Sequence, residues 1–101
     1  MKIETINVRN IIEESILRNA IIVDVRDRED FLKGHIPMAV GIPLENIEQG
    51  KFKLPKNKDI ITYCYRGSRS MMATRILTRK GYRAINAIGG IENYNGSLSK
   101  G

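Results

Sequence analysis

The 101-residue sequence predicts an α/β fold in which helices cover a mainly parallel β-sheet. Apolar, β-branched runs such as AIIVDV at 20–25 are typical of strands that are covered on both faces. These runs alternate with segments of helical periodicity, and Gly or Pro residues separate the two kinds of segment. No shift in composition indicates a second domain, so residues 1–101 are expected to form one domain.

The chain is expected to begin with a short edge strand at 3–6 and a helix after it. Asn10 is predicted to cap this helix, with Glu13 at the capping-box position. The apolar face of the helix is predicted from three residues at helical spacing: Ile12, Ile16 and Leu17.

The second strand is expected at 20–25, and a short helix follows it. Asp27 is predicted to cap this helix, which runs through residue 32, and Gly34 to end it. A third short strand is expected at 39–42, because Pro43 cannot continue the ladder of hydrogen bonds. A helical turn near 44–47 and a lysine-rich loop at 50–58 complete this half of the chain.

The fourth strand, at 59–63, ends directly before Cys64. A helix is expected at 70–80, with Gly81 as its stop, and a fifth strand at 82–88. The pair Gly89-Gly90 predicts a turn before a last helical turn at 91–94. The apolar side of the 70–80 helix is predicted from these residues: Met72, Ala73, Ile76 and Leu77.

Composition limits the classes of partner. The formal net charge of +6 and the pI of about 9.7 favour anionic ligands. No run of basic residues with interleaved aromatic residues occurs, so nucleic acid is not expected as a partner. No apolar stretch is long enough for a membrane span and no secretory leader is visible, so we expect a cytoplasmic protein without membrane contact.

The chain contains one cysteine, Cys64, and one histidine, His35. A single thiol excludes an internal disulfide, and one residue of each type excludes the usual cysteine and histidine metal clusters. No metal ion is therefore expected, and no feature of the sequence implies an organic cofactor. The thiol is therefore an unreactive packing residue, a regulatory sensor or a nucleophile. The residues around it in the sequence must distinguish these three roles.

The segment YCYRGSRS at 63–70 predicts an anion-binding loop around the thiol. In parallel sheets, ligands bind at the carboxyl ends of strands, where Cys64 lies. The following helix presents unpaired N–H groups, and Arg66 and Arg69 add positive charge, so the nucleophilic thiolate is favoured. Gly67 allows the backbone to turn so that successive N–H groups face one anion.

Four stretches together resemble the single-domain rhodaneses, a family of sulfurtransferases. They are IVDVRDREDF at 22–31, GHIPMAVGIPL at 34–44, YCYRGSRS at 63–70 and GYRAINAIGGIENY at 81–94. The resemblance covers most of the chain in the family's order. It implies a rhodanese-like fold, a five-stranded, mainly parallel sheet with helices on both faces, over residues 1–101.

The resemblance also implies roles for particular residues. Cys64 matches the family's nucleophile, which carries sulfur as a persulfide in a six-residue loop. Met38 stands where glycine is common, and Tyr94 where tryptophan is common. The remaining matches are the substrate-binding loop residues Tyr65, Arg66, Gly67, Ser68 and Arg69, and the structural residues Asp24, Arg26, Gly34, His35 and Pro37.

The expected reaction is ping-pong sulfur transfer. The Cys64 thiolate takes sulfur from a small anionic donor such as thiosulfate and passes it to an external acceptor, because no second cysteine is present. The acceptor is a thiol, cyanide or a protein. Arg69 either contacts the donor or forms an ion pair with an acid such as Asp24 or Glu29. His35 is expected to be a turn residue whose ring bonds the backbone, and not a general base.

Two alternatives stay open at the level of sequence. One is a phosphatase or arsenate reductase of the same fold, whose loop has five residues between cysteine and arginine, whereas four separate Cys64 from Arg69. A shorter loop carries fewer N–H groups, so it is expected to fit a single sulfur atom better than a tetrahedral oxyanion. The other alternative is a persulfide carrier or interaction module without turnover.

Overall fold

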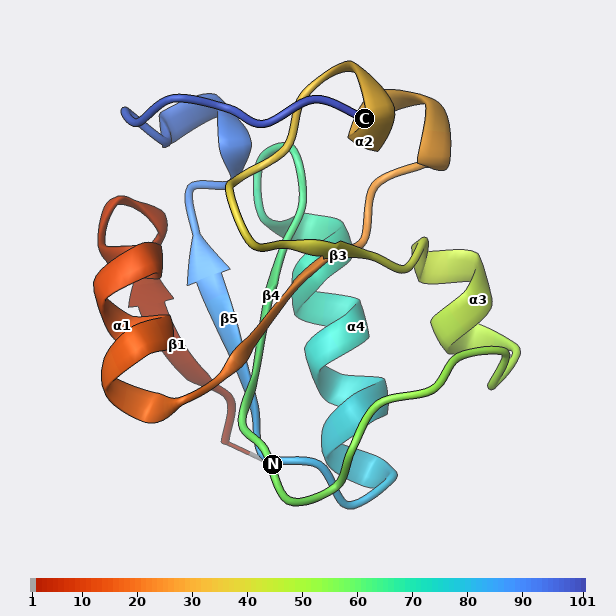
Figure 1. The fold of residues 1–101 in the computed structure, drawn as a ribbon. Coiled ribbons are helices and arrows are strands. Elements are labelled where there is room, and N and C mark those ends of the chain that lie inside the picture. The colour runs from red at the N-terminus through yellow and green to blue at the C-terminus, as the bar shows by residue number, and fades with distance from the viewer. Residues whose placement is uncertain (1) are drawn as a thin grey trace.

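A computed structural model describes residues 2–101 as a five-stranded, entirely parallel sheet of order β1-β5-β4-β2-β3 with helices on both faces (Figure 1). The α/β fold predicted from the sequence is therefore confirmed. The strands are β1 (Glu4–Asn7), β2 (Ile21–Asp24), β3 (Val40–Gly41), β4 (Ile60–Tyr63) and β5 (Ala84–Ile88). The helices are α1 (Ile11–Arg18), α2 (Arg28–Lys33), α3 (Leu44–Glu48) and α4 (Ser68–Arg79), with 3₁₀ turns η1 (Val8–Asn10) and η2 (Ile91–Asn93).

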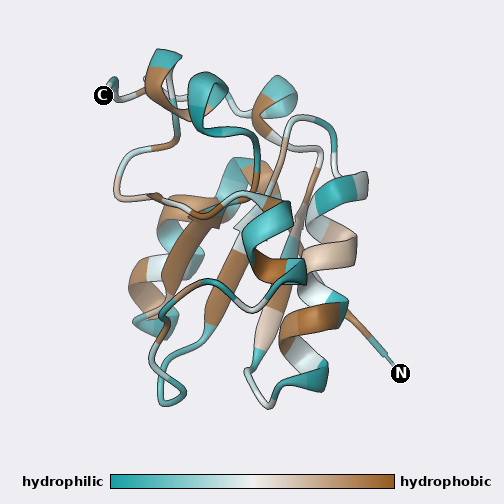
Figure 2. Ribbon diagram, turned by 90° about the vertical axis from the view of Figure 1, so that its right-hand side faces the viewer, coloured by the Kyte–Doolittle hydropathy of each residue, from teal (hydrophilic) through white to brown (hydrophobic). Residues whose placement is uncertain are grey.

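The sheet separates two apolar layers because successive strand residues point to opposite faces. Figure 2 shows hydrophobic residues concentrated on the central strands and hydrophilic residues on the surrounding loops. On one face, α3 and α4 cover residues such as Val23 and Ile60. On the other face, α1 and the two 3₁₀ turns cover residues such as Ile22 and Ile61. No helix within residues 2–101 is long and apolar enough to cross a membrane.

The central strand β4 positions the functional loop. All four of its residues are buried, and it lies between β5 and β2. Ile61 pairs with Ile22 on one side and Ile85 on the other, so branched side chains of three strands form one row. A strand fixed on both sides gives Cys64, the next residue, a well-defined position.

The predicted apolar face of α1 is wrong at two of its three residues. Ile12 packs against the core, but Ile16 and Leu17 are 67% and 80% exposed. The helix buries Ile11 and Ser15 instead. The turn η1 before the helix sets this rotation, because it buries Val8 and brings the chain into α1 at Ile11.

The predicted caps of the first two helices also differ from the structure. Asn10 makes no side-chain capping bond, because η1 begins earlier and Asn7 caps it by accepting a bond from the Arg9 N–H at 2.9 Å. Asp27 precedes α2 without a capping bond, since its carboxylate accepts a bond from Arg69 instead.

Helix α4 begins at Ser68, two residues before the predicted start. Ala73 and Leu77 are buried as predicted, but Met72 is 49% exposed. The helix buries Thr74 as well, and the Thr74 Oγ1 lies 2.7 Å from the Oγ1 of a threonine in β4. The helix therefore packs on the sheet through a partly polar face at its N-terminal end.

Ion pairs connect the edge strand β1 to its neighbours. Arg18 of α1 contacts Glu4 at 2.7 Å and Asp59 at 3.8 Å, and Arg83 contacts the same two acids. The hydrogen bond from Arg18 lowers the pKa of Glu4 below its ordinary value. These pairs join residues that are far apart in the sequence at the amino end of the sheet.

Candidate functional site

Cys64 lies at the carboxyl end of β4, with its thiol enclosed by the start of α4. The residue is only 2% exposed. Its Sγ accepts hydrogen bonds from the backbone N–H groups of Gly67, at 3.0 Å, and Ser70, at 3.3 Å. Two donors on the sulfur stabilise its anionic form, because hydrogen bonds to a charged group are stronger than those to a neutral one.

The loop turns sharply at Gly67 so that its N–H groups converge. Gly67 has a φ of 130°, which side chains disfavour, and it is the residue that precedes α4. Within residues 2–101, no hydrogen bond uses the N–H groups of Arg66, Ser68 or Arg69. These three N–H groups, which flank the two that bond the Cys64 sulfur, therefore have no partner among the described residues.

A turn after β5 supports this loop from behind. The N–H groups of Ile91 and Glu92 donate to the carbonyl oxygens of Cys64, at 2.8 Å, and Tyr65, at 3.1 Å. At Gly90, which has a φ of 63°, a Cβ atom would lie 2.2 Å from the Tyr65 oxygen. The carbonyl groups of Cys64 and Tyr65 thus point to the turn. The N–H groups of Gly67 and Ser70, on the other side of the loop, bond the sulfur. The sequence predicted the Gly89-Gly90 turn but not its contact with the loop.

Ser70 was not among the predicted site residues. It is fully buried, and its Oγ lies 3.3 Å from the Cys64 Sγ and 3.2 Å from the Gly67 carbonyl oxygen. The sequence signal that could have identified Ser70 is its position in the first turn of the helix that follows Cys64.

A buried network fixes the backbone beside the loop. Asp24 has no exposed surface and accepts bonds from the Arg26 guanidinium, at 2.8 Å, and from the Tyr63 hydroxyl, at 2.6 Å. Arg26 also donates to the Gly34 carbonyl at 2.6 Å, and the Ile36 N–H donates to the Tyr63 hydroxyl at 3.0 Å. Burial, together with the Asp24 carboxylate, raises the pKa of Tyr63. Asp24 and Arg26 thus connect the segment after β2 to that before β3.

The two loop arginines are exposed and paired with acids. Arg69 lies 3.4 Å from Asp27, and neither Asp24 nor Glu29 is its partner. Arg66 lies 3.5 Å from a carboxylate oxygen of Glu92. Neither pair is buried, so each stabilises the fold only weakly and leaves the guanidinium free to move.

A polar hollow adjoins the loop. Its lining residues include both arginines and aspartates, so the aspartate carboxylates offset the positive charge of the arginines. The lining residues are Arg26, Asp27, Asp30, Tyr65 and Arg69.

His35 has a structural environment. Its Nδ1 lies 3.0 Å from the Phe31 carbonyl oxygen, and its ring stacks on the Phe31 ring with centroids 3.9 Å apart. Its backbone forms an antiparallel bridge with Ser99. These contacts agree with the predicted turn residue and show no contact with Cys64.

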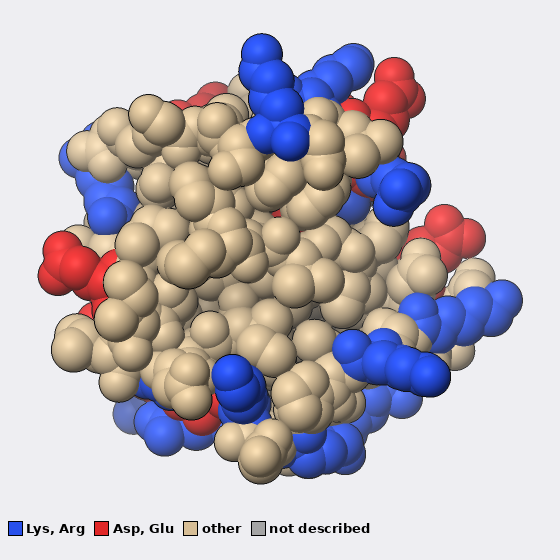
Figure 3. All heavy atoms as spheres, in the orientation of Figure 1, with Lys and Arg blue, Asp and Glu red and all other residues tan. Residues whose placement is uncertain are grey.

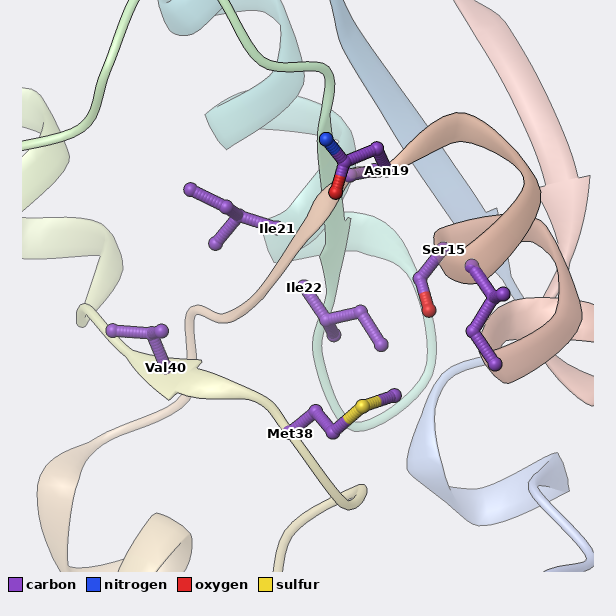
Figure 4. Close-up of a pocket in the computed structure, with 8 residues that line it drawn as sticks. Ser15, Asn19, Ile21, Ile22, Met38 and Val40 are labelled. Carbon is purple, nitrogen blue, oxygen red and sulfur yellow. The ribbon is translucent and has the colours of Figure 1, made fainter.

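An apolar hollow lies away from the thiol, between α1 and β3. Figure 3 shows that this face of the molecule is largely uncharged, and Figure 4 shows Ile22, Met38 and Val40 around the hollow. Met38, which is 61% exposed, has a φ of 73°, a left-handed conformation that glycine would adopt without strain. The Ser15 hydroxyl that lines this hollow donates to the Ile12 carbonyl oxygen at 2.8 Å, so the candidate site with reactive chemistry is the Cys64 loop.

Comparisons with known proteins agree with this geometry. The sequence profile of the rhodanese-like domain matches residues 8–97. The chain is 38% identical over 76 residues to the proposed sulfur carrier YrkF of Bacillus subtilis, covering 74% of this chain and 41% of YrkF. It is 30% identical over 78 residues to the thiosulfate sulfurtransferase GlpE of Coxiella burnetii, covering 76% and 73%.

A solved structure has the same fold. The crystal structure of a rhodanese-like domain protein from Staphylococcus aureus superposes with a TM-score of 0.84 and 27% identity, covering 98% of this chain and 99% of that chain. The chain spans less than half the length of YrkF, so the match to that relative concerns one part of it.

Proposed function

The chain belongs to the rhodanese-like sulfurtransferase family, and we propose that Cys64 carries the transferred sulfur as a persulfide. One observation carries the proposal: a buried thiol at the end of a central strand accepts two backbone N–H bonds, at 3.0 and 3.3 Å. This arrangement stabilises a thiolate, which is the nucleophilic form of cysteine.

In the first half-reaction, sulfur moves from the donor to Cys64. With thiosulfate, the Sγ thiolate attacks the outer sulfur, the S–S bond of thiosulfate breaks, and sulfite leaves with the electron pair. The charge of the thiolate moves to the outer sulfur of the new persulfide. The unpaired N–H groups of Arg66, Ser68 and Arg69 are the donors available for that sulfur.

In the second half-reaction, an external acceptor attacks the outer sulfur. The persulfide S–S bond breaks, its electron pair returns to the Cys64 Sγ, and the thiolate is regenerated. Cyanide would leave as thiocyanate, and a thiol acceptor as its persulfide. The acceptor must come from outside, because Cys64 is the only cysteine of the chain.

The test is to trap the intermediate. Incubation with thiosulfate should add one sulfur atom, about 32 Da, to the nucleophilic thiol, and cyanide should remove it. Cys64→Ser should abolish both the mass increase and thiocyanate formation. A Cys64→Ser variant that still transfers sulfur would overturn the assignment.

The second candidate is a persulfide carrier that accepts sulfur but turns over slowly. The relation to YrkF favours it, because YrkF is described as a sulfur carrier. Both candidates form the persulfide, so the rate of discharge to cyanide or to a thiol separates them. An enzyme discharges repeatedly, whereas a carrier keeps its sulfur until a particular acceptor protein is supplied.

The rival of the same fold is a phosphatase or arsenate reductase. Two N–H groups of the loop already donate to the Cys64 sulfur itself. This supports a loop that has room and donors for one added sulfur atom, and not for a tetrahedral oxyanion. The protein should therefore show negligible turnover of aryl phosphates or arsenate. Robust phosphate-ester hydrolysis without detectable sulfur transfer would refute the proposed function.

A further inference from the structure

We infer that Ser70 is a catalytic residue, whose hydroxyl donates a hydrogen bond to the Cys64 sulfur when that sulfur is a thiolate. The inference deepens the proposed function and rests on it. Ser70 has no exposed surface, and its Oγ lies 3.3 Å from the Sγ. Among the described residues, the hydrogen-bond partners of this hydroxyl are the Cys64 sulfur and the Gly67 carbonyl oxygen.

The contacts allow two arrangements of the hydroxyl proton. When Cys64 is protonated, its S–H donates to the Ser70 Oγ, and the Ser70 O–H donates to the Gly67 carbonyl at 3.2 Å. When Cys64 is a thiolate, it has no proton to donate, and rotation about the Cβ–Oγ bond directs the Ser70 O–H to the sulfur. Donation to the anion is the stronger bond.

The rotation leaves no carbonyl without a partner. The Gly67 oxygen also accepts a bond from the Met71 N–H at 3.2 Å. The hydroxyl can therefore leave this oxygen without the penalty of an unsatisfied buried acceptor. Because the Met71 N–H already satisfies the Gly67 carbonyl, the Ser70 hydroxyl is not needed as its hydrogen-bond donor.

The two half-reactions use this bond differently. In the thiolate the negative charge is on the Sγ, which the Ser70 hydroxyl reaches. In the persulfide the charge is on the outer sulfur, and the Sγ is neutral. Discharge returns the electron pair to the Sγ, so the hydroxyl stabilises the leaving thiolate. Capture begins from the stabilised thiolate, so the same bond does not accelerate it.

The test measures the half-reactions separately in wild type and Ser70→Ala. Capture should be compared at a pH above which neither protein reacts faster, so that both begin as thiolates. Loss of a hydrogen bond to the departing charge should slow discharge of the persulfide to cyanide by about tenfold. Capture of sulfur from thiosulfate should be as fast as in wild type or faster.

Two further variants separate this role from a structural one. Ser70→Thr, which keeps a hydroxyl, should recover much of the discharge rate. Thr78→Ala removes from the same helix a hydroxyl that bonds a backbone carbonyl at 2.7 Å, and it should change neither rate. Ser70→Ala that slows both half-reactions equally, or neither, would overturn the inference.

Failure of the proposed function is recognisable independently. If the wild-type protein takes up no sulfur, the sulfurtransferase proposal fails, and alkylation of Cys64 by iodoacetamide then tests Ser70. At neutral pH, Ser70→Ala should be alkylated more slowly than wild type, because it lacks one donor to the thiolate. Equal alkylation rates would show that the hydroxyl does not act on the sulfur.

Discussion

Replacing Gly90 by alanine should disrupt the support behind the catalytic loop. The added Cβ would lie 2.2 Å from the Tyr65 carbonyl oxygen, 2.4 Å from its carbon and 2.7 Å from the Arg66 nitrogen. All three are backbone atoms, so no side-chain rotation relieves the contact. Either the turn after β5 or the Tyr65–Arg66 peptide has to move.

The cost has two parts. An alanine in the left-handed conformation, with φ at 63°, costs about 1–2 kcal/mol. Separation of the turn from the loop weakens the Ile91 and Glu92 hydrogen bonds to the loop carbonyls, each worth about 0.5–1.5 kcal/mol. The unfolding free energy should therefore fall by about 2–5 kcal/mol.

Urea denaturation and sulfur transfer should be measured on the same preparations. Gly50→Ala is the matched control, because Gly50 has a φ of 71° but only a flexible lysine end near its Cβ position, at 3.8 Å. The control should lose only the conformational part and keep full activity. If Gly90→Ala matches Gly50→Ala in stability and retains wild-type transfer, the support proposed for the loop is wrong.

Three further variants test the surroundings of the site. Tyr63→Phe leaves a buried Ile36 N–H and Asp24 each without one partner, so the unfolding free energy in urea should fall by about 2–4 kcal/mol; an unchanged value would contradict the network. Glu4→Gln should be less stable than wild type at pH 7, and the difference should shrink as the pH falls through the folded pKa of Glu4. This follows because the lowered pKa of Glu4 stabilises the fold above the unfolded pKa of about 4.3, and that stability is lost as the pH falls through the folded pKa. In kinetics with thiosulfate, the KM should rise with Arg69→Ala and fall with Asp27→Asn, and salt should reduce both effects; a KM unaffected by either change would exclude an electrostatic role for this pair.

Local patterns were enough to predict most of the fold. Burial on both faces makes a parallel strand a continuous apolar run, so AIIVDV at 20–25 and DIITY at 59–63 identified β2 and β4. The same reasoning placed Cys64 at a strand end before a helix. These predictions succeeded because each depends on residues that are close together in the sequence.

The face of α1 could not be obtained in this way. Periodicity alone allows a stripe through Ile12, Ile16 and Leu17 or one through Ile11 and Ser15. The neighbouring turn and the sheet beneath it select the second stripe and keep Ile12 partly buried, at the expense of exposing the large apolar side chains of Ile16 and Leu17. Contacts between elements, and not the spacing within one, decide such a rotation.

The sequence by itself determined the α/β class, the order of the elements and the thiol in a glycine-bearing loop before a helix. Only the tertiary structure showed that Ser70 reaches the sulfur, that Arg69 pairs with Asp27, and that the turn at Gly90 holds the carbonyls of the loop. The physical reason is that hydrogen bonds and close contacts depend on distances of a few tenths of an ångström. Such distances are set only when β4, β5 and α4 are packed together.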